Sequence, residues 1–386
     1  MIRIRLPEKN DYYKLQKKYL EMIKKYVMFD ERDIIPGSDK KPQGKSKQTA
    51  EKLRNSYPTL YKFLFAENSN TVKRDNLRRL LAGPDVLPDS FGGSGGIYET
   101  MISNFENIIS LCPLPENEKV AINCCKEIFP YTNGFGKSVD DTYWLLRALN
   151  VRVCPYCNRI YTITLPSKEE LANEKEFKTT RATLDHFYPK NKYPYLALSL
   201  FNLVPSCHIC NNNKGAEDKK IIYPYDEAFE KNAVFGIIPD LKASREEESN
   251  PLNFLLGESI QFYIRFMGNG EVSLIHDLPL SERLVNIKDD SYRERIEKSV
   301  EIFRLEQQYD EHKEEVRDIL RNRYYFNEQY IQNAVCPLLH QKMRNIGIDQ
   351  LKDIAMDMLF FTHLDQEEWG KRPLSKLTSD ILDQIS

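Results

Sequence analysis

The sequence is poor in cysteine and tryptophan and has no long apolar run. Its 386 residues include 8 cysteines and 2 tryptophans, and so few cysteines exclude a scaffold held together by disulfides. The N-terminal residues lack the apolar segment of a secretory signal. Apolar runs such as Met358–Phe361 fall far short of the roughly 20 residues that cross a membrane. We therefore expect a cytoplasmic protein with no membrane partner.

Positive and negative charges nearly balance over the whole chain, but the N-terminal end is basic. The 55 Lys and Arg nearly balance the 57 Asp and Glu. Residues 1–80 hold 20 Lys or Arg against 10 Asp or Glu, so the rest of the chain sums to −12. Clustered basic side chains bind the phosphates of nucleic acids. A basic solvated helix face would have the same composition, and the sequence leaves these two interpretations open.

Three regions follow from the distribution of helical patterns and motifs. Residues 1–149 are expected to be mostly helical, residues 150–226 carry the short motifs described below, and residues 227–386 are again mostly helical. In the first region, apolar residues recur at helical spacing over 12–29, 48–66, 71–82, 97–111, 117–127 and 139–149. The predicted fold is therefore mainly α, with a small central α+β module.

Two features of the C-terminal region can be placed more closely. Residues 261–275 alternate in polarity around Gly268-Asn269-Gly270, which predicts a β-hairpin. Residues 291–325 predict one long charged helix. Its expected buried side consists of Ile296, Val300, Phe303 and Leu305.

Four of the cysteines form two C-x-x-C pairs, Cys154 with Cys157 and Cys207 with Cys210. Each pair places two thiolates on one tight turn, and two such turns complete a tetrahedral sulfur shell that suits Zn²⁺. A shell closed by four sulfurs is structural rather than catalytic. A thioredoxin-like dithiol is the alternative, but it requires one pair and not two.

A strand, a loop, a second strand and a helix are predicted around these pairs. Residues 182–186 are expected to form the first strand, residues 202–206 the second strand, and residues 211–214 the start of the helix. This order brings residues that are far apart in the sequence to one point.

Four polar residues on these elements suit phosphodiester cleavage. His186 has the pKa of a base that works near neutral pH. Asp185 offers a carboxylate oxygen and Asn211 an amide oxygen to Mg²⁺, which keeps several waters and needs few protein ligands. Asn202 is expected to position the imidazole or to brace the loop.

In this order the motifs resemble the HNH, or ββα-metal, nucleases, and specifically the branch with four zinc-binding cysteines. The resemblance covers the central region alone. It implies that Asp185 and Asn211 bind catalytic Mg²⁺ or Mn²⁺, that His186 is the general base, and that Asn202 supports it. Some members have a further ligand one helical turn later, where this chain has Gly215, and this leaves a third protein ligand open.

Three lysines lie close to these motifs in the sequence, Lys190, Lys192 and Lys214. We expect them to contact nucleic-acid phosphates, with ordinary solvated lysine as the alternative interpretation. The layout of the flanking helices, above all the predicted long helix, is loosely similar to bacterial anti-phage HNH effectors of the Septu and retron-associated kind. That similarity implies a defence effector controlled by a partner ATPase.

The prediction is a Mg²⁺-dependent HNH endonuclease that hydrolyses phosphodiester bonds of double-stranded DNA. One alternative is a zinc-stabilised module that binds nucleic acid or protein without catalysis. Another is an RNA or tRNA nuclease on the same centre, because such a centre contacts phosphate rather than the 2′-hydroxyl.

Overall fold

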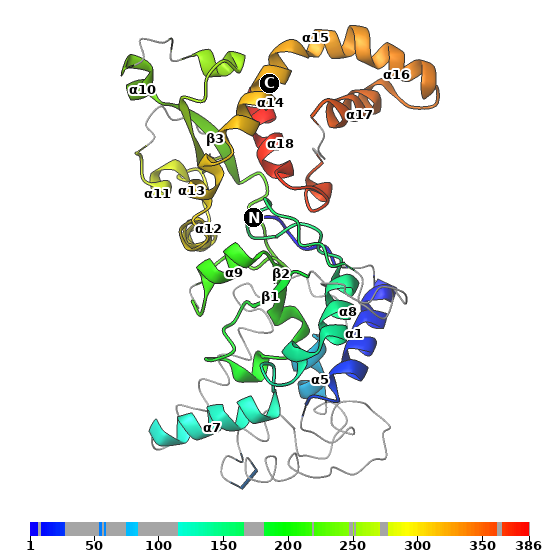
Figure 1. Ribbon diagram of the computed structural model, residues 1–386, viewed down its shortest axis with the longest axis vertical. Helices are drawn as coiled ribbons and strands as arrows, with labels where there is room; N and C mark the ends of the chain where they lie inside the picture. The colour runs from blue at the N-terminus through cyan, green and yellow to red at the C-terminus, as the bar shows by residue number, and fades with distance from the viewer. Residues whose placement is uncertain are drawn as a thin grey trace, which may run out of the picture.

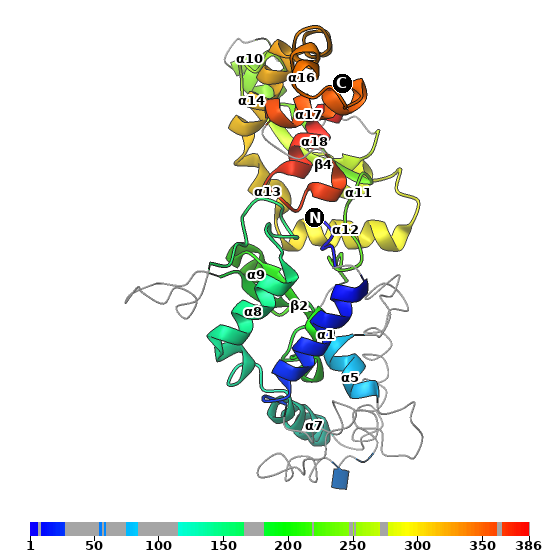
Figure 2. The same cartoon turned by 90° about the vertical axis from the view of Figure 1, so that its right-hand side faces the viewer.

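A computed structural model gives the fold of this chain. It describes residues 1–6, 9–27, 54–55, 58, 75–83, 115–165, 181–217, 220–246, 250, 252–270, 277–360 and 365–385. Over these residues the protein is mainly α-helical with two small antiparallel sheets. The molecule is elongated, with the N-terminal helices at one end, the C-terminal helices at the other, and the first sheet between them (Figures 1 and 2).

The N-terminal end is built from four described helices: α1 (Lys9–Ile23), α5 (Asp75–Ala82), α7 (Pro115–Ile128) and α8 (Val139–Leu149). They match the helices predicted at 12–29, 71–82, 117–127 and 139–149, whereas those predicted at 48–66 and 97–111 fall almost wholly outside the described residues. In α1 the apolar residues at helical spacing are buried, and lysines cover the exposed face. Most of the basic stretch beyond α1 also lies outside the described residues, so the choice between a phosphate-binding and a solvated face stays open.

The central region contains the predicted strand–loop–strand–helix order. Strand β1 (Thr183–His186) pairs antiparallel with β2 (Leu203–Ser206), with Thr183 opposite Ser206 and His186 opposite Leu203. The loop between the strands holds two short 3₁₀ turns, η3 (Pro194–Leu196) and η4 (Leu200–Asn202).

The following helix, α9 (His208–Lys214), begins earlier than predicted. Cys207 is its N-cap residue and accepts the Cys210 N–H at 3.4 Å through its sulfur. Asn211 therefore lies inside the helix and not at its start.

A second sheet lies in the C-terminal region, where β3 (Ala233–Pro239) pairs antiparallel with β4 (Phe262–Gly268). Strand β4 is the first arm of the predicted hairpin, but its partner here is a strand that precedes it in the sequence. The expected second arm, residues 271–275, lies outside the described residues. Strand β3 is an almost continuous apolar run and is largely buried, so it lacks the alternation of polarity that reveals a half-exposed strand.

The outer edge of β3 is covered by side chains of the last helix, α18 (Ser375–Gln384). Asp380 accepts the N–H of Phe235 at 2.9 Å, and Gln384 accepts the N–H of Ile237 at 3.1 Å. Four residues along a helix rise about 6.0 Å, and two residues along a strand span about 6.6 Å. One face of a helix can therefore occupy successive outward N–H groups of a strand.

The predicted long helix over residues 291–325 is wrong, because three helices occupy this stretch: α12 (Asp290–Ile302), α13 (Leu305–Asp310) and α14 (Lys313–Tyr325). The first break is at Arg304, which adopts a left-handed backbone with φ of 49°. The expected apolar residues of this segment are all buried. The break lets α13 turn its acidic side chains onto β4 while these apolar residues stay in the core.

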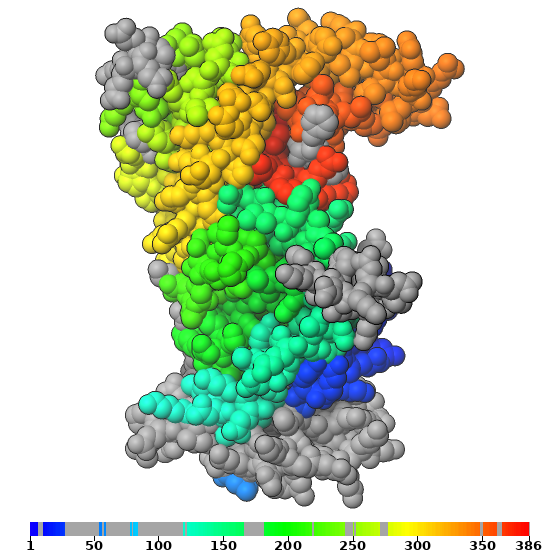
Figure 3. Space-filling model, viewed as in Figure 1, coloured from blue at the N-terminus to red at the C-terminus, as the bar shows by residue number. Residues whose placement is uncertain are grey.

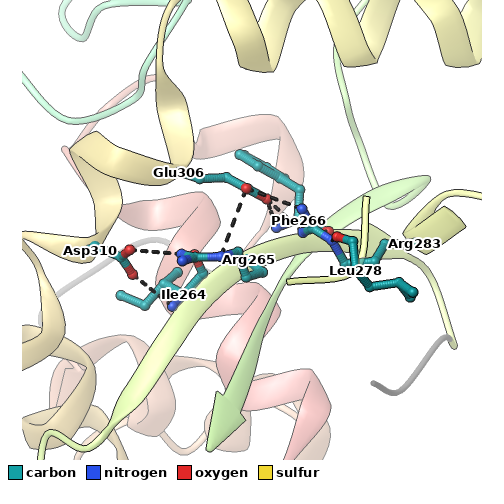
Figure 4. Close-up of polar contacts among 7 residues, drawn as sticks. All are labelled: Ile264, Arg265, Phe266, Leu278, Arg283, Glu306 and Asp310. Carbon is teal, nitrogen blue, oxygen red and sulfur yellow. Dashed lines mark hydrogen bonds and ion pairs between the residues drawn. The ribbon is translucent and has the colours of Figure 1, made fainter. Parts of the chain in front are cut away.

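The outer edge of β4 is covered in the same way by α13 (Figure 4). Asp310 accepts the N–H of Ile264 at 3.0 Å, and Glu306 accepts the N–H of Phe266 at 2.9 Å. Arg283 bridges this arrangement, donating to the Phe266 carbonyl and to Glu306, each at 2.6 Å. Both edges of the two-stranded sheet are thus occupied by helix side chains.

An arm within the C-terminal region projects from the body of the molecule (Figures 1 and 3). It consists of α15 (Glu328–Tyr330), the π-helical turn η6 (Ile331–Val335), α16 (Cys336–Lys342) and α17 (Ile348–Phe360). The arm has a small buried cluster of its own, made of Ile331, Cys336, Leu351 and Ala355. The remaining short helices are η1 (Phe135–Lys137), α10 (Leu241–Glu246), η5 (Asn253–Leu256), α11 (Leu280–Arg283) and η7 (Gln366–Glu368).

One continuous cluster of buried hydrophobic residues runs through all three sequence regions, from α1 to α18. The division at residues 149 and 226 stays a prediction. Within the part of the chain that the structure describes, no helix is both long enough and apolar enough to cross a membrane.

Candidate active site and metal centre

The two cysteine pairs meet at one point between the first sheet and the C-terminal region. Cys154, Cys157, Cys207 and Cys210 are all buried, and their sulfur atoms lie within 4.8 Å of one another. The Cys157 and Cys207 sulfurs are 3.9 Å apart. Zn–S bonds of about 2.3 Å in a tetrahedron separate the sulfurs by about 3.8 Å. The four side chains therefore fit a structural Zn²⁺.

The electrostatics of the cluster also favour a cation. Burial, together with the neighbouring sulfurs of Cys157 and Cys207, raises the pKa of the Cys154 thiol. Four thiolates cannot stay ionised side by side in a buried site unless a positive charge balances them. Among the described residues, this is the one group of three or more His, Cys, Asp or Glu side chains arranged to share an ion.

The first cysteine turn is anchored by residues of the C-terminal region. Tyr309 on α13 donates its hydroxyl to the Cys157 carbonyl. Asn158, with a left-handed φ of 52°, donates to the Trp369 carbonyl at 2.9 Å and accepts the Lys376 N–H at 3.1 Å. The turn is thereby fixed to the C-terminal region.

His186 is buried at the end of β1, and its ring orientation is fixed. Its Nε2 atom lies 3.0 Å from the Ala197 carbonyl oxygen. A carbonyl only accepts, so Nε2 carries the proton and Nδ1 presents a lone pair. The edge of the Tyr131 ring packs against the imidazole, with ring centres 4.2 Å apart. Burial, reinforced by the charge of Lys190, lowers the pKa of His186 to about 3. The ring is therefore neutral at physiological pH, and its pKa lies below the near-neutral value expected from the sequence.

Asn202 braces the loop that carries the Ala197 carbonyl. Its side-chain oxygen accepts the Tyr188 N–H at 2.7 Å, and its amide nitrogen donates to the carbonyls of Tyr188 and Leu196 at 3.1 and 2.9 Å. Asn202 is fully buried. Of the two roles expected for it, the structure shows the bracing of the loop, which in turn holds the acceptor of the His186 ring.

Asp185 precedes His186 on β1 and is almost completely buried. The Tyr156 hydroxyl donates to its Oδ2 atom at 2.6 Å, and the Lys214 ammonium lies 3.3 Å from its Oδ1 atom. Burial raises the pKa of Asp185, and Lys214 and Tyr156 act against this change by favouring the charged form. The carboxylate is thus oriented by two donors.

The three lysines that were expected to contact nucleic-acid phosphates lie in different environments. The Lys214 side chain is only 1% exposed, and its ammonium donates to the His186 carbonyl at 2.7 Å, so it does not face solvent as a phosphate contact would require. Lys190 is half-buried, with its ammonium 5.7 Å from the centre of the Tyr131 ring. Lys192 is exposed. Phosphate contact stays a prediction for the last two.

Asn211 is half-buried on α9, one turn before Lys214, and its backbone N–H donates to the Cys207 carbonyl at 3.0 Å. Its role as a metal ligand stays a prediction. Gly215 ends α9 with φ of 55° and ψ of −127°, a conformation that suits glycine. The helix therefore ends at the position where the sequence left a third protein ligand open.

Two residues of the site were missed by the sequence analysis. Tyr156 lies between the cysteines of the first pair, and its position inside that turn was an available signal. Tyr131 follows α7, far from the motifs in sequence, and no spacing pattern pointed to it. Burial raises the pKa of Tyr131 to about 12, so its phenol is neutral beside His186.

The four-cysteine cluster and the buried Asp-His pair define this region as a candidate metal-binding site on a short antiparallel sheet and a helix. No protein-family model and no solved structure matches the chain, so the assignment to the HNH nucleases stays a prediction. A stretch of 37 residues is 49% identical to the Septu protein PtuB of Bacillus thuringiensis. This stretch makes up 10% of this chain and 14% of that protein. The matched part thus spans about one seventh of that protein's length.

Proposed function

We propose that this protein is a metal-dependent endonuclease of the HNH type that hydrolyses phosphodiester bonds of DNA and serves in anti-phage defence. The observation that carries the proposal is the geometry of His186, whose Nε2 is committed to the Ala197 carbonyl, which leaves the lone pair of the ring on Nδ1. The defence context rests on the short similarity to a Septu protein, and a partner ATPase belongs to the same proposal.

The proposal gives each of four residues a role. Nδ1 of His186 accepts a proton from the attacking water. Asp185 and Asn211 offer hard oxygen ligands for Mg²⁺ or Mn²⁺, which when bound would neutralise charge on the phosphate and on the leaving oxygen. Asn202 keeps the loop, and hence the imidazole, in place. The pairing of Asp185 with the Lys214 ammonium indicates that this carboxylate can balance a positive charge.

A second candidate function is a zinc-stabilised binding module without catalysis. The burial of both reactive groups favours it, because Asp185 and His186 are only 2% and 7% exposed. In that case the contacts of both side chains serve to satisfy buried polar atoms, and no chemistry follows.

Cleavage assays separate these functions. Supercoiled plasmid and a structured RNA are incubated with the protein in Mg²⁺ or Mn²⁺, with and without EDTA. The protein is tested alone and as purified with the products of its neighbouring genes. We expect metal-dependent cleavage of the plasmid and a loss of about 10²- to 10⁴-fold in His186→Ala, the range for a general base.

The matched control is His208→Ala. His208 is exposed on α9 and should leave both cleavage and folding unchanged. Cleavage of RNA alone would replace DNA by RNA as the substrate. No metal-dependent cleavage of either substrate would refute the nuclease and favour the binding module. Full activity in His186→Ala would refute the role of His186 as the general base.

A further inference from the structure

The two oxygens of the Asp185 carboxylate are held by donors from the two cysteine-bearing elements. Tyr156, between Cys154 and Cys157, donates to Oδ2 at 2.6 Å. Lys214, on the helix that begins at the second cysteine pair, lies 3.3 Å from Oδ1. Both elements contribute cysteines to the same sulfur cluster. The same two segments of the chain therefore hold the cluster and the Asp185 carboxylate.

Both the position and the orientation of the Tyr156 ring are fixed. It is fully buried, and it stacks on Phe303 with ring centres 4.4 Å apart and an angle of 20° between the planes. Its backbone lies in the cysteine turn, which Tyr309 anchors through the Cys157 carbonyl. A hydroxyl held this firmly imposes one orientation on the carboxylate that accepts from it.

We propose that Tyr156 is a positioning residue, which transmits the geometry of the four-cysteine zinc centre to Asp185 and so prepares this carboxylate for a divalent cation. This inference rests on the proposed function. An ionised carboxylate has about four lone-pair sites, and Tyr156 and Lys214 occupy one on each oxygen. The remaining lone pairs are thereby left in fixed directions for a cation.

A purely structural role for the hydroxyl makes a different prediction. If the Tyr156 hydroxyl only satisfies the buried Oδ2 atom of Asp185, its loss lowers the stability of the fold and leaves the affinity for a divalent cation unchanged. If it positions Asp185, its loss weakens the binding of a divalent cation while the sulfur cluster stays intact. Outer-sphere partners of metal ligands typically change affinity by about 10- to 100-fold when they are removed.

The test is Tyr156→Phe, which keeps the ring, its stacking on Phe303 and both neighbouring cysteines. Mn²⁺ affinity is measured by titration calorimetry or by the electron paramagnetic resonance of free Mn²⁺, and zinc content by mass spectrometry of the native protein. We expect about one zinc per chain in wild type and variant, and Mn²⁺ affinity about 10- to 100-fold weaker in the variant.

Tyr19→Phe is the matched control, because it also removes a buried tyrosine hydroxyl, but one on α1 that donates to the Leu198 carbonyl at 2.8 Å and belongs to neither cysteine-bearing element. It should lower the midpoint of thermal unfolding by an amount similar to Tyr156→Phe and leave Mn²⁺ affinity unchanged. If Tyr156→Phe does not fold, Phe303→Leu loosens the same ring without removing the hydroxyl, and a smaller loss of Mn²⁺ affinity is expected.

The outcomes separate this inference from the function on which it rests. Wild-type protein that binds Mn²⁺ and cleaves nucleic acid, beside a Tyr156→Phe variant of equal Mn²⁺ affinity, overturns the role of Tyr156 alone. Equal losses of affinity in Tyr156→Phe and Tyr19→Phe overturn it too, because they indicate general loosening of the fold. Wild-type protein that neither binds Mn²⁺ nor cleaves overturns both proposals.

Discussion

Replacing Asp380 with asparagine should leave a buried lysine without its counter-charge. Lys376 and Asp380 are 2.8 Å apart on α18, with 0% and 1% of their side chains exposed. Burial lowers the pKa of Lys376 and raises that of Asp380, and their mutual attraction opposes both changes. Asparagine has nearly the same shape, and its amide oxygen can still accept the Phe235 N–H. The variant therefore removes the charge and little else.

The lysine itself sets an upper limit on the cost of this substitution. Breaking a buried ion pair costs about 3–5 kcal/mol, but Lys376 can lose its proton instead. Deprotonation at about pH 7.5, from an ordinary pKa of 10.5, costs about 4 kcal/mol at about 1.4 kcal/mol per pH unit. We therefore expect Asp380→Asn to lower the free energy of unfolding by about 3–4 kcal/mol at that pH.

The cost should also depend on pH, with a sign that follows from proton linkage. In the variant, the folded-state pKa of Lys376 lies further below its unfolded value, so the unfolded chain binds more protons. Stability relative to wild type then rises with pH. At about pH 9.5 the limit set by deprotonation has fallen to about 1.4 kcal/mol.

Urea unfolding followed by tryptophan fluorescence measures both effects. Trp369 is buried, with the Lys376 ammonium 4.9 Å from its ring centre, and a Trp144→Phe background leaves it as the sole tryptophan. The control is Asp383→Asn on the same helix, whose partner Lys231 is 2.9 Å away while the side chains are 58% and 56% exposed. Exposed pairs contribute about 0–1 kcal/mol.

Two results would refute this reasoning about the buried pair. One is a loss in Asp380→Asn no larger than in Asp383→Asn. The other is a loss that stays the same between the two pH values, because an unpaired buried ammonium cannot keep a constant cost while it approaches its own pKa.

Four further predictions concern other parts of the fold. Cys157→Ala should abolish zinc binding and expose the central region to proteolysis, because apparent binding free energies of structural zinc are about 10–16 kcal/mol; mass spectrometry checks both. Asp141→Asn should flatten the acid side of the curve of stability against pH. Burial raises the pKa of Asp141, but hydrogen bonds from neighbouring side chains outweigh burial and lower the pKa from 3.8. The stabilisation by Asp141 is therefore present above that pH and lost in stronger acid, which urea unfolding at several pH values will measure. Gly257 has φ of 67°, and α14 lies within 2.8 Å of the carbon that alanine would add. Gly257→Ala should therefore lower the free energy of unfolding, measured in urea, by about 1–3 kcal/mol. The loss should be larger than in Gly270→Ala, where the added carbon meets nothing within 4 Å. Asn202→Ala should lower cleavage while zinc content stays constant, and an unchanged rate would contradict its role in holding the loop.

The parts of the site that depend on local spacing could be predicted from the sequence. A C-x-x-C pair puts two sulfurs on one turn whatever surrounds it, and the strand–loop–strand–helix order could be placed within a few residues. The donors to Asp185 could not be predicted, because they depend on how two turns pack against one strand. Lys214 illustrates the limit. A lysine that follows three asparagines suggests exposure to solvent, whereas its burial depends on the carboxylate of Asp185.

The C-terminal fold was harder to predict for a related reason. The break at Arg304 occurs without a glycine or proline, between two residues, Phe303 and Leu305, that are both fully buried. Strand β3 lacks alternation, and its pairing with β4 joins segments separated by α10 and η5. Such choices are made by tertiary packing, which local patterns do not contain.

The covering of both edges of the second sheet restricts how other molecules can attach to it. A bare strand edge accepts any extended segment, from a partner protein or from another copy, through backbone hydrogen bonds that ignore sequence. Here Asp380, Gln384, Glu306 and Asp310 already occupy outward N–H groups. Strand addition at these positions would first require α18 or α13 to be displaced, so the two helices protect this sheet from unselective pairing.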